Sequence, residues 1–69
     1  MKIENPVVVE FKDGGMRKWA IYGRDPSVRR TVYLHQDGFW RPVAWPDGHF
    51  LSKSGAEAVL NEYRRKAAS

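Results

Sequence analysis

The sequence predicts a small α+β domain, in which a four- to five-stranded antiparallel sheet built from hairpins carries one C-terminal helix on one face. Three observations support this fold class. Glycine-containing turn signals recur at short intervals over the first fifty residues. The segments between these turns are rich in β-branched and aromatic residues, which favour strands. From residue 52 onward, apolar residues recur at every third or fourth position, which is the period of a helix.

A first hairpin is expected to begin at Pro6. The run from Pro6 to Phe11 suits a strand, and its first residue suits a sheet edge because proline cannot donate a ladder hydrogen bond. Gly14-Gly15 supplies the positive φ angles that a tight turn requires, and it lacks the length and the lysine of a phosphate-binding loop. The return strand is expected over Met16 to Tyr22, and residues 23–30 form a connection.

The central hairpin, residues 31–45, turns at Asp37-Gly38, and two registers are open. A two-residue turn would place Val32, Leu34, Phe39, Val43 and Trp45 on one face and Thr31, Tyr33, His35, Trp40, Pro42 and Ala44 on the other. A three-residue turn with a bulge at Gly38 would shift the pairing by one, with Trp40 beside Val32 and Leu34, and Phe39 beside Tyr33 and His35. The register therefore decides which aromatic side chains are buried.

A third turn is expected over Pro46 to His49, followed by a short strand over His49 to Leu51 and then the helix. Two N-caps compete: Ser52, with Leu51 as a hydrophobic staple to Ala56, and Ser54, with Glu57 completing a capping box. We favour Ser52. The apolar stripe of the helix consists of Ala56, Val59, Leu60, Tyr63 and Ala67. We expect one domain over residues 1–69, with the sheet over about 6–51 and the helix over about 53–67.

Composition narrows the function classes. The chain has no cysteine and only two histidines, so we expect neither a disulfide, nor a metal site, nor another cofactor. No apolar run approaches the roughly 20 residues that span a bilayer, and the N-terminal one is too short for a signal peptide, so we expect a cytoplasmic protein that contacts no membrane. The net charge of +4 and the pI near 9.8 favour an acidic partner, either nucleic acid or an acidic protein surface.

Catalysis is not expected. The serines at positions 27, 52 and 54 are explained as turn and cap residues, and three of the aspartates precede glycine in turns. A domain of 69 residues also lacks the walls of a deep pocket. An enzyme would require a pocket that pairs His35 or His49 with a carboxylate.

Basic and aromatic residues are interleaved through the centre of the chain. Arginine outnumbers lysine, and its planar guanidinium suits phosphates, guanine edges and carboxylates. If the second and third strands pair, the cations gather at one end of the sheet, with Arg17 and Arg41 projecting from the strands. Interleaving of Trp40, Tyr33 and Tyr22 would then give a basic and aromatic sheet face. The candidate binding residues are Arg17, Arg24, Arg29, Arg30, Tyr33, Trp40 and Arg41. The competing interpretation makes the arginines a solvated rim and the aromatic residues part of the core.

The segments Arg17 to Tyr22 and Thr31 to Leu34, followed by a helix that contains Ala56 to Leu60, resemble the AP2 and integrase-type domains. That resemblance implies a three-stranded sheet held against DNA and braced by a helix. It also implies that Arg17, Trp19, Arg29 and Arg41 contact DNA. The chain departs from the pattern by inserting residues 37–49, an extra strand and turn, before the helix.

Two function hypotheses follow. We favour a non-catalytic module that binds nucleic acid, such as DNA, through a basic and aromatic sheet face. The alternative is a protein-binding inhibitor or adaptor that blocks a host protein complex, because in size and plan the chain resembles small proteins of phages and mobile elements. Either could act as a monomer or as a homodimer.

Overall fold

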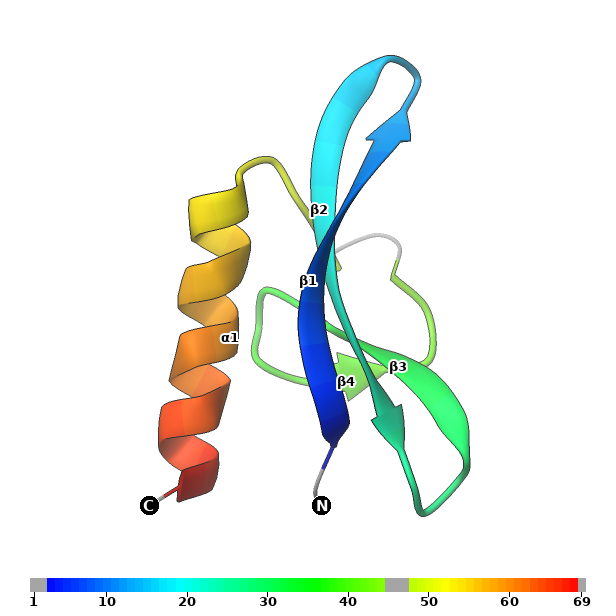
Figure 1. Ribbon diagram of the computed structural model, residues 1–69, viewed down its shortest axis with the longest axis vertical. Helices are drawn as coiled ribbons and strands as arrows, with labels where there is room; N and C mark the ends of the chain where they lie inside the picture. Colours follow the sequence, from blue (N-terminus) through cyan, green and yellow to red (C-terminus); the bar gives the residue numbers. More distant parts are fainter. Residues whose placement is uncertain (1–2, 45–47, 69) are drawn as a thin grey trace.

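The computed structural model describes residues 3–44 and 48–68, and it confirms an antiparallel sheet of five strands with one C-terminal helix (Figure 1). The elements are β1 (Glu4–Asp13), β2 (Met16–Asp25), β3 (Arg30–Leu34), β4 (Trp40–Arg41), β5 (His49–Phe50) and α1 (Lys53–Ala68). Residues 45–47 lie outside the described residues. Two predictions fall on them: the face of the sheet on which Trp45 lies, and most of the third turn.

Strand β2 is the centre of the sheet. The strand order is β1-β2-β3-β4, and β5 pairs with β2 beyond the end of β3. The first part of β2 places Trp19 opposite Phe50 of β5, and its last part pairs with β3. Helix α1 covers one face of this sheet along its length (Figure 1).

The first hairpin is longer than the sequence predicts. Gly14 and Gly15, with φ angles of 59° and 86°, form a two-residue turn between Asp13 and Met16. Strand β2 continues to Asp25 because its last residues pair with the start of β3. The Asp25 carboxylate then accepts hydrogen bonds from the backbone N–H and the hydroxyl of Ser27, at 3.0 and 2.7 Å, which fixes the turn into β3.

The central hairpin uses the three-residue turn, so the two-residue register is wrong. The backbone N–H of His35 donates to the carbonyl of Phe39 at 3.0 Å, and that of Gly38 donates to the carbonyl of His35 at 2.9 Å. Gly38 has a φ of 88°, the left-handed conformation expected at a bulge of this kind. Leu34 consequently lies opposite Trp40, which turns the indole toward α1.

The core lies between the sheet and α1. Its buried members are Ile21, Leu34, Phe50, Ala56 and Leu60, and partly buried side chains pack around them: Val8, Trp19, Trp40, Val59 and Tyr63. Trp40 meets Tyr63 edge to face, with ring centroids 5.2 Å apart and planes at 80°. The predicted helical stripe is confirmed except at its last residue, since Ala67 is exposed.

The start of α1 is capped by Ser52, as favoured from the sequence. The hydroxyl of Ser52 accepts the N–H of Gly55 at 3.0 Å, and its carbonyl accepts the N–H of Ala56 at 3.2 Å. Leu51 remains 72% exposed, so the predicted staple to Ala56 buries little of it.

The end of the core nearer the β2–β3 turn is closed by residues near the two ends of the chain. Ile3 is buried and lies against Gly23, at which a side chain would collide with it. The backbone N–H of Ile3 donates to the hydroxyl of Tyr63 at 3.5 Å. Gly23 is therefore used for close approach and not for an unusual φ.

Trp40 provides a test of this packing. We expect Trp40→Ala to lower the free energy of unfolding by about 3 kcal/mol, because it removes a large ring from the space between β3 and α1. Trp40→Phe should cost about 1 kcal/mol or less, since the buried indole N–H has no hydrogen-bond partner among the described residues. Urea unfolding followed by circular dichroism measures both values. Equal stability of the alanine variant and the unmodified protein would contradict the assigned register.

Candidate nucleic-acid interface

The sheet face away from α1 carries a pair of tyrosines whose rings meet at a tilt. Because side chains alternate along a strand, burial of Ile21 under α1 turns Tyr22 to the opposite face. The register places Tyr22 directly opposite Tyr33, and their ring centroids lie 6.5 Å apart at an interplanar angle of 55°. Tyr22 is 38% exposed and Tyr33 is half-buried. We call Tyr22 and Tyr33 the tyrosine platform.

The other part of this face is covered by the chain that follows β4. His35 is buried, and its Nε2 donates to the carbonyl of Val43 at 2.6 Å. The ring of His49 lies 5.0 Å from that of Phe11, and Ala20 beneath is 4% exposed. The part of the face nearer the β2–β3 turn is not covered by these contacts, and this is where the tyrosine platform lies.

Both histidines make contacts with other parts of the described chain. His35 uses its Nε2 on a backbone carbonyl, and His49 packs on Phe11. Over residues 3–44 and 48–68 there is no group of three or more His, Cys, Asp or Glu side chains that could hold a metal ion.

Three exposed arginines lie at or beside the β2–β3 turn. Arg24 follows Tyr22 on the same face and lies opposite Thr31. Arg29, with a φ of 52°, ends the turn, and Arg30 begins β3 opposite Asp25, so strand alternation places Arg30 on the other face from Tyr33. None of the three forms an ion pair within the described part of the chain. We call Arg24, Arg29 and Arg30 the turn arginines.

A shallow hollow of about 200 Å³ lies beside the platform, and its lining combines both kinds of group. The lining residues are Glu4, Asn5, Tyr22, Gly23, Arg24 and Thr31. Glu4 lies opposite Arg24 in the register and is the acidic residue of this hollow, whereas Asp25 is 6% exposed and bonded to Ser27. Arg24 and Glu4 balance within the lining, and the excess of positive charge at this end of the sheet comes from Arg29 and Arg30 at the adjoining turn.

Arg41 is held within its own hairpin. Its guanidinium donates to both carboxylate oxygens of Asp37, at 2.9 and 2.7 Å, and lies 5.7 Å from the centre of the Phe39 ring. This bidentate pair, with the N–H of Phe39 as a further donor, lowers the pKa of Asp37 to about 2. Arg41 borders the open face opposite Tyr33, but its charge is partly neutralised there.

The other residues that the sequence suggested for binding lie away from the tyrosine platform. Arg17 stands near the Gly14-Gly15 turn, with its Nε 3.6 Å from a carboxylate oxygen of Glu10. Trp40 and Trp19, the latter suggested by the AP2 resemblance, both pack on the helix side of the sheet. Of the sequence candidates, Arg24, Tyr33 and Arg41 share the open face, and Arg29 and Arg30 lie at the adjoining turn. Tyr22 completes the group, and the alternation of β2 is the signal that identifies it.

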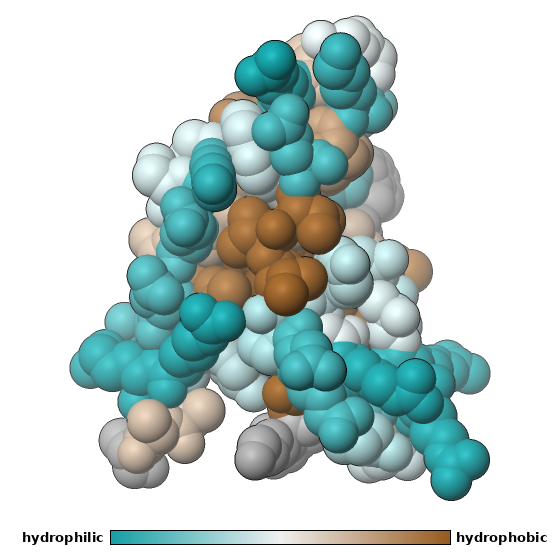
Figure 2. All heavy atoms as spheres, in the orientation of Figure 1, coloured by the Kyte–Doolittle hydropathy of each residue, from teal (hydrophilic) through white to brown (hydrophobic). Residues whose placement is uncertain are grey.

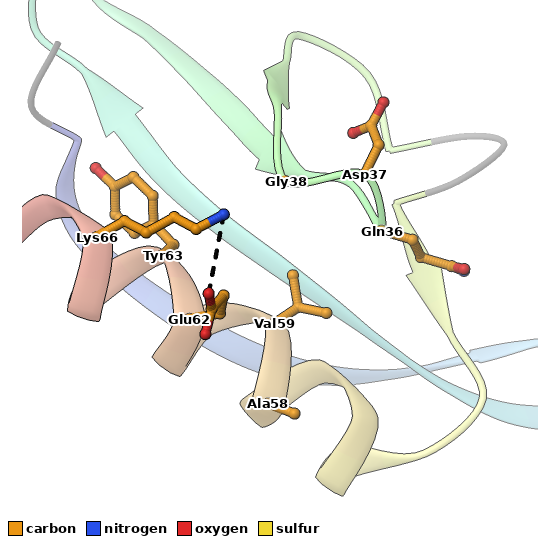
Figure 3. A pocket seen from close by; sticks show the side chains of 8 residues that line it. All are labelled: Gln36, Asp37, Gly38, Ala58, Val59, Glu62, Tyr63 and Lys66. Atoms are coloured by element: carbon orange, nitrogen blue, oxygen red, sulfur yellow. Dashed lines mark ion pairs between the residues drawn. The ribbon is translucent and has the colours of Figure 1, made fainter.

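A second hollow runs between the 36–38 turn and α1 and has a volume of about 310 Å³ (Figure 3). Val59 and Tyr63 give it an apolar wall. Its charged groups already have partners, since Glu62 pairs with Lys66 at 3.8 Å and Asp37 pairs with Arg41. This hollow suits an apolar side chain better than a phosphate.

No protein-family model, curated protein or solved structure matches this chain. The similarity to the AP2 and integrase-type domains accordingly stays a prediction. The described residues contain no helix long and apolar enough to cross a membrane.

The Asp37–Arg41 pair predicts a pH dependence. A carboxylate whose pKa is lower in the folded than in the unfolded chain stabilises the fold above its unfolded pKa, and this contribution is lost as the pH falls toward the folded pKa. For Asp37 the loss should occur between the ordinary value of 3.8 and about 2. Carboxyl-carbon NMR should show the midpoint near 2, and Asp37→Asn should reduce the fall in stability over this range. Titration of Asp37 near 3.8 would contradict the pair.

Proposed function

We propose that the protein is a non-catalytic module that binds single-stranded nucleic acid on its open sheet face. The observation that carries the proposal is the tyrosine platform with Arg24 beside it on the same face, next to a turn that carries two further arginines. Aromatic rings accept unpaired bases by stacking whatever their sequence, and arginines beside them bind the connecting phosphates. A duplex offers its bases only at groove edges, so an exposed aromatic ring favours unpaired strands, whose base faces are accessible.

Electrostatics supports the same partner. The net charge of the chain is +4, and three of its arginines are concentrated at one turn without intramolecular ion pairs among the described residues. An unpaired guanidinium is available to a phosphate without first breaking a bond in the protein. Binding should release counterions and therefore weaken steeply as salt concentration rises.

The stacking and the charge contributions can be separated by mutation. Tyr22→Ala should weaken binding of a labelled single-stranded oligonucleotide by about 1–3 kcal/mol while leaving the slope of log affinity against log salt unchanged. Arg24→Gln together with Arg29→Gln should instead reduce that slope by about 2, one for each lost phosphate contact. Fluorescence anisotropy at several salt concentrations measures both effects.

Arg17→Gln is the matched control, because it removes the same charge near the opposite end of the first hairpin. It should change affinity and slope less than either substitution at the β2–β3 turn. Equal effects of Arg17→Gln and Arg24→Gln would indicate nonspecific attraction to the whole cationic surface. Absence of binding to both single strands and duplexes at low salt would overturn the proposal.

A protein-binding inhibitor or adaptor is the second candidate, and one observation favours it. Phe39 is 65% exposed on the 36–38 turn hairpin, Leu51 is 72% exposed before α1, and the apolar hollow of Figure 3 adjoins that turn. Exposed apolar groups around a hollow are typical of protein-binding surfaces. For this function, Phe39→Ser should abolish a nuclease-resistant interaction with one host protein, whereas Tyr22→Ala should leave it intact.

A further inference from the structure

Strand β1 forms a free edge of the sheet. Within the described residues it pairs with β2 and with no other strand, although it is ten residues long. An edge strand of this length leaves a row of backbone groups that can pair with another strand.

The hairpin geometry identifies which groups point outward. The residues that flank a two-residue turn, here Asp13 and Met16, exchange hydrogen bonds, so every second residue of β1 counted back from Asp13 points toward β2. The N–H and C=O groups of Val8, Glu10 and Lys12 then point to the free edge. Arg64 of α1 donates to the carbonyl of Pro6 at 3.2 Å, which shows that this carbonyl too is turned away from β2.

The middle of this edge is apolar and uncharged. Val7, Val8 and Val9 lie between Pro6 and Glu10, and Val7 is 41% exposed. In Figure 2, which looks onto β1, hydrophobic residues gather at the centre of the view with hydrophilic residues around them. Edge strands that remain monomeric commonly carry a charge or a proline in their middle, and β1 has neither between residues 7 and 9.

We propose that β1 pairs antiparallel with β1 of a second copy of this chain, centred on Val8. In this register the two Val8 residues exchange backbone hydrogen bonds across a two-fold axis, and Val7 lies opposite Val9 of the partner on both sides. The valine run is symmetric about Val8, so each valine meets a valine. A shift of the centre to Glu10 would oppose two like charges and is disfavoured.

The two-fold axis of such a pair is perpendicular to the sheet, so it keeps the faces of the two copies aligned. Both α1 helices then lie on one side of a continuous sheet, and both tyrosine platforms lie on the other. If the proposed nucleic-acid function holds, the dimer presents two platforms to one strand, which raises affinity by effective concentration. The pairing itself rests on the β1 edge alone.

The first test measures self-association in the absence of nucleic acid. Sedimentation equilibrium over a dilution series should show a monomer–dimer equilibrium for the unmodified chain. Val7→Lys should weaken it by about tenfold or more, because it places a charge at each Val7–Val9 contact. Val28→Lys is the matched control, since Val28 is 56% exposed in the β2–β3 turn, and it should change the constant by less than about twofold.

Single cysteines then test the register, because the chain contains none of its own. Under mild oxidation Val8→Cys should form a disulfide-linked dimer faster than Val9→Cys, and Val28→Cys should not form one. A faster reaction of Val9→Cys would overturn the Val8-centred register. A monomer at all concentrations would overturn the proposed dimer. The same conclusion would follow if a folded Val7→Lys variant associated as strongly as the unmodified chain. Neither result depends on whether oligonucleotides bind.

Discussion

The structure depends on the alternation of side chains along β2. Ile21 is fully buried under α1, and this one contact determines the direction of its neighbours on the strand. It turns Tyr22 to the open face and brings Gly23 back to the helix side, where only a hydrogen fits beside Ile3. A helix on one side of the sheet and an aromatic surface on the other are thus two results of the same alternation.

Much of this arrangement could be predicted from local chemistry. The Gly14-Gly15 turn, the cap at Ser52 and the stripe that contains Leu60 depend on residues close together in sequence, and the structure confirms all three. The register of the central hairpin could not be chosen in advance, because both turns place Gly38 acceptably. The choice is made by tertiary packing: the three-residue turn brings Trp40 against Tyr63, twenty-three residues away, whereas the two-residue turn would turn it to the other face.

In the candidate site, too, some features can be predicted from neighbouring residues in the sequence and others depend on tertiary contacts. The cationic character of residues 24–30 is visible in the sequence, but the pairing of Tyr22 with Tyr33 becomes visible only when β2 is known to extend to Asp25. Arg41 could not be recognised as internally paired from composition, since its partner Asp37 had already been assigned to the turn. The cationic region was therefore visible in the sequence, whereas the positions of its individual side chains required the structure.

The contact between Ile3 and Tyr63 has a consequence for synthesis of the chain. These residues come from opposite ends of the described chain. Together with Gly23 they close the end of the core nearer the β2–β3 turn. On the ribosome the sheet is made first, and its helix side has no cover until α1 emerges. During that interval Ile21, Leu34 and the valines of β1 are all exposed in one nascent chain. A pause before the helix codons would prolong a state prone to aggregation, so the rate of translation through this short segment bears on the yield of folded protein.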